Sequence, residues 1–317
     1  TSTKEMIASV LSEKYCVLKT EGNFNNEIGL PLTVFNLREE HEVAVLEMGI
    51  SHFGDMEPLA RIARPDVCVI TNIGYAHLEN LGTRDGILKE KTSMFDFMNP
   101  EGTVILNGDD DKLRGYTSKR GIQPVYFGLD PTCPFHAEQI QKMGLKGTVA
   151  TFVTPSSSFS AHVSIPGDHM ISNALAGVAV GYALGMKDEE IIRGIEKLVP
   201  IAGRNNLIEA EHYTIIDDCY NANPVSMKAS VDVVDMALGR KVCILGSMFE
   251  LGDNEKNLHY DVGQYVGAKS IDVLITIGDL ARHIAMGAAD YRETHYESYD
   301  CSIHSYDTIE EFENEAG

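Results

Sequence analysis

The chain has 317 residues, a net charge of −21, 44% hydrophobic residues and 23% charged residues. This length is too great for one ordinary core and indicates two domains, and the composition is that of a globular protein. The acidic balance excludes a nucleic acid bound through a Lys/Arg surface, and the lack of any apolar run near roughly 20 residues excludes a membrane-spanning protein, so no membrane partner is expected.

The N-terminal segment and the cysteines indicate the compartment. Residues 1–5 contain neither the basic nor the apolar stretch of an export signal, so we expect a cytoplasmic location. The six cysteines show no C-x-x-C spacing, which argues against a zinc knuckle or a redox pair and favours reduced thiols. If such an acidic protein binds nucleotides, helix N-termini, metal ions and a few placed cations must hold them.

The chain begins with a predicted helix, from Thr1 to about Lys14, whose apolar residues fall on one face. Thr1, Ser2 and Thr3 then lie where the helix dipole and the orphan amides attract anions. Ordinary N-capping is one alternative for Thr1. The other is that Thr1 is the last residue of a phosphate-binding loop, G-x-x-G-K-[ST], without its glycines and lysine.

Short β-rich runs alternate with helical stretches over the next hundred residues, which is typical of an α/β fold. The runs are nearly continuous and apolar, as in parallel strands that are covered on both faces. The predicted strands are 43–47, 67–72 and 103–107, and the predicted helices are 55–64 and 84–98.

The pattern changes from about Gly147 to Pro166, where alternating residues predict an antiparallel hairpin attached to the first domain. The break at 200–203 places the domain boundary after residue 202. A second βα series follows and predicts a smaller Rossmann-like domain over 203–317. Further predicted helices are 171–184, 188–198 and 226–238, and the predicted strands of the second domain are 213–217, 241–246 and 272–278.

Three polar residues of the first domain follow its predicted strands. Glu47 ends one strand, His77 follows the next, and Lys91 lies on the helix after it. Taken singly each is a weak signal, because a lone histidine is more often structural and Lys91 could be a solvated helix lysine. The carboxyl edge of an open α/β sheet is where ligands bind. The combination is therefore better explained by a metal-phosphate site.

Longer motifs, which span nearly the whole chain, carry a resemblance to one family. The chain resembles the Mur ligase family, and within it the branch that adds D-alanyl-D-alanine. The most discriminating motif is Asp-Asp-Cys-Tyr-Asn-Ala-Asn-Pro at 217–224, followed by Ser-Met at 226–227. The other matching stretches are 22–33, 72–81 and 167–176.

The resemblance implies an α/β fold with two domains. Residues 1–202 would form a P-loop-type central ATPase domain with a mostly parallel sheet, and residues 203–317 a C-terminal Rossmann-like α/β domain. It also implies that ATP drives amide formation between D-alanyl-D-alanine and a UDP-N-acetylmuramoyl-tripeptide through an acyl phosphate. This step belongs to peptidoglycan precursor synthesis, and so to cell shape and division. A cytoplasmic, monomeric enzyme is expected.

The resemblance also implies two magnesium sites in the first domain. Thr1 and Glu47 match the residues at the first Mg²⁺, and His77 and Lys91 match the region of the second. The family's lysine is typically carbamylated, and a carbamate at Lys91 would be attracted to Mg²⁺ whereas an ammonium would be repelled. His77, Lys91 and Arg204 would take the catalytic roles.

Nucleotide contacts are implied from both domains. Asn173 matches a contact near the adenine of ATP, Asp218 the carboxylate that holds its ribose, and Arg204 the arginine that reaches its terminal phosphate.

The implied contacts to the other substrates involve asparagines. Asn25 and Asn26 match a loop that meets the UDP-sugar, for which simple turn chemistry is the alternative. Tyr220, Asn221 and Asn223 would face the incoming dipeptide. For the last two, function is favoured over turn chemistry, because the proline at 224 already supplies the turn.

The chain departs from the family pattern in three places. The family's N-terminal domain and the glycine-lysine half of its phosphate loop are absent, so only trace ligase activity is expected of the chain alone. A final lysine-glycine-serine strand is absent too, and Ser247 stands where relatives often carry aspartate. Two alternatives stay open: a sister ligase of the folylpolyglutamate or cyanophycin type, and a non-catalytic nucleotide-binding remnant. Buried charges such as Glu47 disfavour the remnant.

Overall fold

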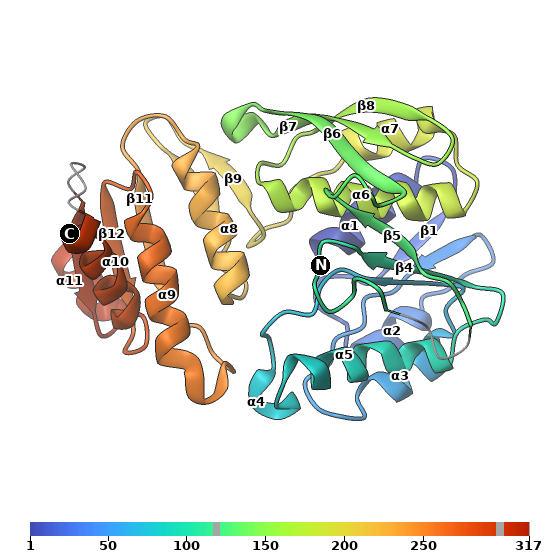
Figure 1. Cartoon of the computed structure of the whole chain (residues 1–317), viewed down its shortest axis with the longest axis horizontal. Helices are drawn as coiled ribbons and strands as arrows, with labels where there is room; N and C mark the ends of the chain where they lie inside the picture. The colour runs from blue at the N-terminus through green and yellow to red at the C-terminus, as the bar shows by residue number, and fades with distance from the viewer. Residues whose placement is uncertain (117–120, 296–300, 317) are drawn as a thin grey trace. The chain divides into compact units, whose positions relative to one another are not determined.

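The computed structural model describes residues 1–116, 121–295 and 301–316 (Figure 1). The chain divides into two compact units, Thr1–Val199 and Pro200–Gly317, and each is described by itself. The boundary expected from the sequence, after residue 202, falls close to this division. None of the described helices has both the length and the apolar content that crossing a membrane requires.

A six-stranded sheet forms the centre of the first unit, in the order β3-β4-β5-β6-β7-β8. Strands β3 to β6 run parallel, and β7 and β8 are antiparallel additions. The mostly parallel sheet and the hairpin predicted from the sequence are thus present. The strands are β3 (Val67–Ile70), β4 (Thr103–Asn107), β5 (Val125–Gly128), β6 (Phe135–Lys142), β7 (Thr148–Val153) and β8 (Ser158–Val163).

Helices cover both faces of this sheet (Figure 1). One layer contains α1, α6 and α7, and the other contains α3, α5 and the short η1. The helices of the first unit are α1 (Ser2–Leu11), α2 (Gly29–Val34), α3 (Met56–Ala63), α4 (Leu78–Leu81), α5 (Arg84–Thr92), η1 (Ser93–Asp96), η2 (Gly144–Lys146), α6 (Asp168–Ala183) and α7 (Asp188–Glu196).

Strand β4 shows why a continuous apolar run becomes a central strand. Successive side chains of a strand point to opposite faces. Ile105 therefore joins the core beneath α1 and α6, while Val104 and Leu106 join the core on the α3 and α5 side. All three are fully buried. A strand that is covered on both faces must be apolar at every position, as the sequence predicted.

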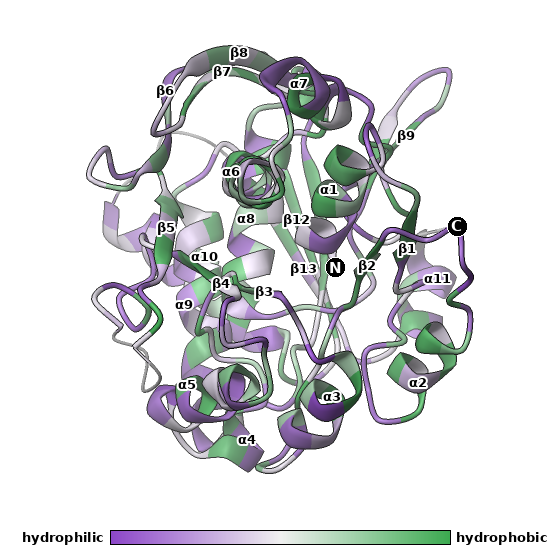
Figure 2. Cartoon of the chain, turned by 90° about the vertical axis from the view of Figure 1, so that its right-hand side faces the viewer, coloured by the Kyte–Doolittle hydropathy of each residue, from purple (hydrophilic) through white to green (hydrophobic). Residues whose placement is uncertain are grey.

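Strand β2 (Val43–Val45) departs from the expectation. It pairs with β1 (Val17–Lys19) in a separate two-stranded parallel sheet, and not with β3. Valines 43 and 45 are accordingly only half-buried. The reason is a cavity of about 580 Å³, which residues 42–48 and 66–71 both line. Because consecutive residues of each segment line it, the edges of β2 and β3 face this cavity. Figure 2 shows β2 beside β1, apart from β3 and β4.

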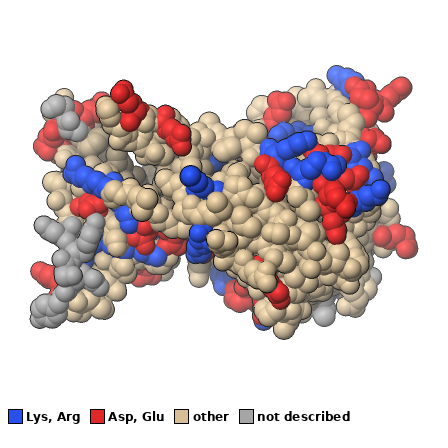
Figure 3. Space-filling view, turned by 90° about the horizontal axis from the view of Figure 1, so that it is seen from above, with Lys and Arg blue, Asp and Glu red and all other residues tan. Residues whose placement is uncertain are grey.

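Helix α1 is held by a close crossing with α7. An ideal Cβ at Gly194 would lie 2.3 Å from the Cα of Val10, and the Ser9 hydroxyl donates to the Gly194 carbonyl at 2.6 Å. Beside the crossing, Glu13 forms ion pairs with Arg193 of α7 at 2.9 Å and with Lys197, the residue after α7, at 2.6 Å. On the face seen in Figure 3, basic side chains of this unit likewise lie beside acidic ones.

The second unit has a parallel sheet in the order β11-β12-β13 and an antiparallel pair, β9 and β10. Its core contains Met227, Met248, Val262 and Leu274, all buried, and it joins α8, α9 and α10 to the parallel sheet. The elements are β9 (Asn206–Glu209), β10 (Thr214–Asp217), α8 (Pro224–Asp235), β11 (Val242–Gly246), η3 (Gly252–Asn254), α9 (Glu255–Gly267), β12 (Val273–Ile277), α10 (Arg282–His295), β13 (Ser302–Tyr306) and α11 (Ile309–Ala316).

Candidate functional site

The N-terminus of α1 lies beside the end of β2 and the start of α6. The Thr1 hydroxyl donates a hydrogen bond to Glu47 Oε1 at 3.0 Å, and the Thr3 hydroxyl donates to Asn173 Oδ1 at 2.6 Å. The helix is anchored here because Met6 is fully buried in the core below α6. One helix terminus thus brings together three of the predicted site residues, Thr1, Glu47 and Asn173.

Glu47 has one satisfied and one unsatisfied carboxylate oxygen. In addition to the bond from Thr1, its Oε1 accepts a hydrogen bond from Asn25 Nδ2 at 3.1 Å, and its backbone N–H donates to Thr20 Oγ1 at 2.9 Å. Its Oε2 is buried and accepts no hydrogen bond, with the Lys4 ammonium 3.9 Å away. Such an oxygen calls for an explanation. A bound cation is the natural one.

Lys4 is a site residue that the sequence analysis missed. Its buried ammonium donates to the Thr20 carbonyl at 2.5 Å and pairs with Glu5 at 2.8 Å. Burial would raise the pKa of Glu5, but hydrogen bonds from Lys19 and Lys4 outweigh it, so the pKa lies below its ordinary value. A signal was available, because Lys4 falls on the apolar stripe of α1, where a cation needs a reason to be buried.

The cavity between β2 and β3 extends from the residues around Glu47 to helix α5. Thr1, Lys4, Glu47 and Lys91 all line it. Lys91 donates from Nζ to the Asn72 carbonyl at 2.9 Å. Burial lowers the pKa of Lys91, and the nearby Asp110 carboxylate partly offsets this effect. The fraction of neutral amine at Lys91 is therefore larger than for an exposed lysine.

Side chains from β4, from the turn after it and from α5 hold the backbone that follows β3. Asn107 Nδ2 donates to the Thr71 carbonyl at 2.9 Å, and Arg84 Nε donates to the Ile73 carbonyl at 2.8 Å. Asp110 Oδ2 accepts from the Ile73 N–H at 2.7 Å. The sequence analysis missed all three side chains. For Asn107 and Asp110 the signal was the Asn-Gly-Asp-Asp run at the end of a predicted strand, which the carboxyl-edge argument should have included.

The chemistry of these donors fits magnesium. Within residues 1–116, 121–295 and 301–316, no three His, Cys, Asp or Glu side chains gather to form a closed metal cage. Mg²⁺ typically keeps several waters and uses one or two carboxylates plus substrate phosphates. The orphaned Glu47 oxygen beside the Thr1 hydroxyl is such a partial site. His77 begins α4 with left-handed backbone, φ 59°, a strained geometry that clusters at functional sites.

In the second unit, two short segments are hydrogen-bonded to each other. The Arg204 guanidinium stacks over the Tyr220 ring, 4.0 Å from its centroid. Asp218 accepts from the Asn205 N–H at 3.0 Å and from the Ser230 hydroxyl. Both carboxylate oxygens of Asp218 therefore already serve the fold, and a ligand hydroxyl would use their remaining lone pairs. The predicted residues Arg204, Asp218 and Tyr220 lie together.

Three predicted asparagines have structural roles. Asn26 Oδ1 accepts from the Gly29 N–H at 2.9 Å at the start of α2, which is the turn chemistry left open for it. Asn221 Oδ1 accepts from the next backbone N–H at 2.9 Å. Asn223 caps α8, accepting from the Ser226 N–H at 3.0 Å, while its own N–H donates to the Ser226 hydroxyl. The sequence argument that the proline at 224 suffices for this turn was wrong, because α8 also needs its N-cap.

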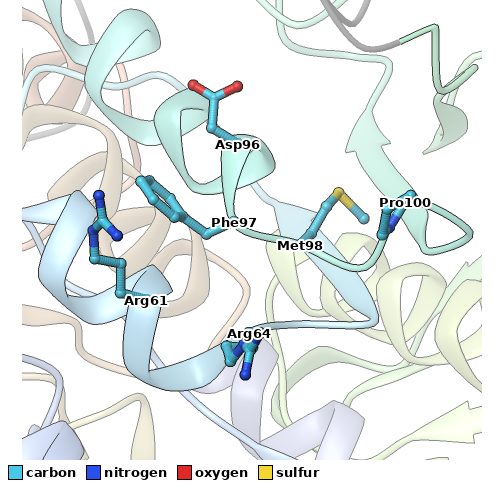
Figure 4. Close-up of a pocket in the computed structure, with 6 residues that line it drawn as sticks. All are labelled: Arg61, Arg64, Asp96, Phe97, Met98 and Pro100. Carbon is cyan, nitrogen blue, oxygen red and sulfur yellow. The ribbon is translucent and has the colours of Figure 1, made fainter.

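A second hollow of about 410 Å³ lies at the end of α3 (Figure 4). Arg61 stacks over Phe97 there, 4.7 Å from the ring centroid, and pairs with Glu57 at 2.8 Å. Arg64 and Asp96 also line this hollow, and none of the predicted site residues does. The chemistry is concentrated around Glu47.

Comparison with known proteins follows the same division of the chain. The family model of the Mur ligase middle domain matches residues 1–181, and that of the Mur ligase glutamate ligase domain matches residues 203–316. The chain belongs to the Mur ligase family. The α/β fold and the mostly parallel sheet that the resemblance implied are thereby confirmed.

The relatives similar to the chain include ligases that are named for adding D-alanyl-D-alanine. The chain is 37% identical over 309 residues to UDP-N-acetylmuramoyl-tripeptide–D-alanyl-D-alanine ligase of Bacillus subtilis, and the match covers 93% of the chain and 65% of that protein. The chain thus spans less than two thirds of this relative's length.

Solved structures agree. MurF from Acinetobacter baumannii matches with a TM-score of 0.86 and 31% identity, over 99% of the chain and 72% of that protein. MurF ligase from Thermotoga maritima, in complex with ADP, matches with a TM-score of 0.81 and 28% identity, over 99% and 77%.

Proposed function

We propose that the chain carries the catalytic centre of a ligase that uses ATP to join D-alanyl-D-alanine to a UDP-N-acetylmuramoyl-tripeptide. The relatives of Bacillus subtilis and Escherichia coli bear the name of this activity, at 37% and 34% identity. The observation that carries the proposal is the Glu47 carboxylate, with one buried oxygen that accepts no hydrogen bond, at the N-terminus of α1. The N-terminus of a helix attracts the phosphate anion, and the carboxylate beside it attracts the metal cation.

The proposed reaction has two steps. The terminal carboxylate of the tripeptide attacks the γ-phosphorus of ATP, forming a P–O bond while the bond to ADP breaks. The amine of D-alanyl-D-alanine then attacks the acyl carbon, releasing phosphate and a proton and leaving the amide. Phosphoryl transfer of this kind depends on positioning and on neutralising charge, so few covalent roles fall to the protein.

The first unit would hold the triphosphate. Thr1 lies at the positive end of the α1 dipole, and Asn173, hydrogen-bonded to Thr3, lies on α6 where we propose that the adenine binds. Thr1 and Glu47 would hold one Mg²⁺, and the His77 and Lys91 region a second. Bound Mg²⁺ supplies charge stabilisation on the phosphate oxygens.

The second unit would complete the nucleotide site. Arg204 would reach the terminal phosphate, with its guanidinium held over the Tyr220 ring, and Asp218 would hold the ribose. Their approach to the triphosphate stays a prediction.

The remaining substrate contacts are also proposals. Asn25 donates to Glu47, and we propose that the loop that contains Asn25 and Asn26 also contacts the UDP-sugar. Asn221 and Asn223 would bind the dipeptide with their remaining hydrogen-bonding groups, beside the exposed Tyr220 ring. The cytoplasmic location and the monomeric state expected from the sequence stay predictions.

We further propose that Lys91 is carbamylated. Only a neutral amine reacts with CO₂, forming the N–C bond and releasing a proton, and burial favours that neutral form by lowering the pKa of Lys91. The carbamate would have to leave the Asn72 carbonyl, which the ammonium now contacts. A carbamate also turns a repelled cation into an anion that attracts Mg²⁺.

Replacing Lys91 with methionine, whose unbranched side chain is one atom shorter and has no amine, is expected to lower turnover by at least about a hundredfold, since several kcal/mol of charge stabilisation depend on the carbamate. Phosphate release by the full product of the gene measures this. The matched control is Lys89→Met, at an exposed position of the same helix, which should stay within about twofold. Removal of bicarbonate should depress the unmodified enzyme and leave Lys91→Met unchanged. A fully active Lys91→Met enzyme contradicts the carbamate.

The function itself is tested with the full gene product, ATP, Mg²⁺, a UDP-N-acetylmuramoyl-tripeptide and D-alanyl-D-alanine. We expect phosphate release that requires all three substrates, and a product mass equal to the joined tripeptide and dipeptide less water. Release with glutamate in place of D-alanyl-D-alanine would assign the chain to a sister ligase. Nucleotide binding without release under any of these conditions would indicate a non-catalytic remnant.

A further inference from the structure

The loop at 247–251 leaves the carboxyl end of β11, the edge at which open α/β sheets bind ligands. Two of its side chains anchor it, because Met248 and Leu251 are buried in the core of the second unit. Phe249, in contrast, is 73% exposed, and Glu250 has left-handed backbone with φ 60°. The loop therefore has a fixed base and displays an aromatic ring and a carboxylate.

The base of the loop is also fixed at its first residue. The Ser247 hydroxyl accepts from the Ala281 N–H at 3.2 Å, and Gly278 makes room for it, since an ideal Cβ there would lie 2.6 Å from the Ser247 oxygen. Ala222 packs against the same core cluster as Met248. The loop thus shares its support with the Tyr-Asn-Ala-Asn segment at 220–223.

A single buried histidine completes this support. His259 of α9 is fully buried, and its Nε2 accepts a hydrogen bond from the Met248 N–H at 2.8 Å. Its Nδ1 lies 2.7 Å from the Glu255 carbonyl. Because Nε2 accepts, the proton must be on Nδ1, which donates to that carbonyl. Both contacts require the neutral imidazole in one tautomer.

The alternative, a histidine that only fills core space, does not account for these contacts. A leucine would fill a comparable volume and leave the Met248 N–H buried without an acceptor, which is the costly outcome for a backbone group. His259 is directed at the loop backbone and not at another side chain. Its role is therefore to hold the loop.

The charged groups around His259 agree with a neutral ring. Burial is the main cause that lowers its pKa, and His283 of α10 lowers it further, whereas Glu255 of its own helix raises it. Asp253 of η3 is exposed. On α8, the Lys228 ammonium lies over the Tyr265 ring, and Asp232 accepts from the Tyr265 hydroxyl.

We propose that His259 is a positioning residue that holds the 247–251 loop so that Phe249 and Glu250 form part of the surface that binds the amine substrate, a zwitterionic dipeptide, next to Asn221 and Asn223. Binding of the dipeptide by this loop rests on the proposed function, whereas the role of His259 in holding the loop rests on the geometry of the second unit alone. The two are tested separately.

The first arm measures hydrogen exchange and the His259 tautomer by NMR on the chain itself. We expect the Nδ1–H tautomer, and exchange of the Met248 amide that is about tenfold faster in His259→Leu, the loss of one hydrogen bond. His259→Gln, whose amide oxygen can accept, should restore slow exchange. His295→Leu, at an exposed position of α10, is the control and should leave it unchanged. Equal exchange in all variants overturns the positioning role.

The second arm measures steady-state kinetics of the full gene product. We expect His259→Leu to raise the KM for D-alanyl-D-alanine about tenfold, with the KM for ATP within about twofold, and His259→Gln to restore it. Faster exchange at Met248 with an unchanged dipeptide KM overturns the role of the loop in binding the dipeptide. An inactive unmodified enzyme overturns the proposed function together with that role, while the hydrogen-exchange measurement still decides whether His259 holds the loop.

Discussion

Replacing Glu47 with glutamine is expected to lower turnover of the full gene product by at least about a hundredfold, because the charge that would hold Mg²⁺ is lost and metal stabilisation contributes several kcal/mol. Glutamine keeps an oxygen that can accept from Thr1 and Asn25, so the local fold should survive. The buried Oε2 position, which now accepts no hydrogen bond, is the one that changes chemistry. Phosphate release at saturating substrates, repeated over a series of Mg²⁺ concentrations, measures the effect.

The matched control is Glu42→Gln, at the other end of the same strand. Glu42 is exposed and accepts from the Cys16 N–H at 3.0 Å. Since it lies away from the N-terminus of α1, its replacement should change turnover by less than about twofold. Equal activity of the Glu47→Gln and Glu42→Gln enzymes would remove Glu47 from the metal site and with it the main support for the proposed function.

The largest effect on stability is expected from Gly194→Ala. Alanine in a helix is intrinsically better than glycine by about 1 kcal/mol. Here the added Cβ would lie 2.3 Å from the Cα of Val10, a backbone atom that no rotamer change can move. Helices α1 and α7 would have to separate, weakening the bond from Ser9 to the Gly194 carbonyl. Overpacking of this kind costs roughly 1–3 kcal/mol or more and outweighs the helix propensity.

We expect the free energy of unfolding of the first unit to fall by about 2 kcal/mol, which lowers Tm by roughly 4–8 °C in a unit of this size. Calorimetry or denaturant unfolding of the chain measures it. Glu189→Ala, at an exposed position of the same helix, is the control and should stay within about 0.5 kcal/mol. If Gly194→Ala is as stable as the unmodified chain or more so, the close crossing of α1 and α7 is wrong.

The α/β fold was predictable because its signals are local. The strand at 103–107 is a short continuous apolar run, and the hairpin at 147–166 carries the two-residue period of side chains; both are present, as β4 and β7–β8. The β6 strand, which extends the hairpin, was missed. Its second half, 138–142, is exposed and polar, and its register shifts between Glu138 and Gln141, so no period is visible there.

The site was predictable in part for the same reason. Glu47 ends a predicted strand and Lys91 lies on the helix after the next one, so a place near the carboxyl edge of a sheet could be inferred for both from their order along the chain. Arg84, Asn107 and Asp110 act through hydrogen bonds to the backbone after β3. The position of Asn107 and Asp110 after a strand was a signal, but a contact between a side chain and distant backbone has no sequence pattern, so the contacts of all three emerged only from the folded chain.

The sequence by itself determined the family, the order of the elements and the residue types that gather at the end of β2. Periodicity and motifs are properties of neighbouring residues, and so they can be read without coordinates. Only the tertiary structure decided that β2 is separated from β3 by a cavity, that Asn223 caps a helix, and that His259 holds the loop after β11. Each of these depends on contacts between segments that are far apart in the chain, and on burial, which sets the free energy of those contacts.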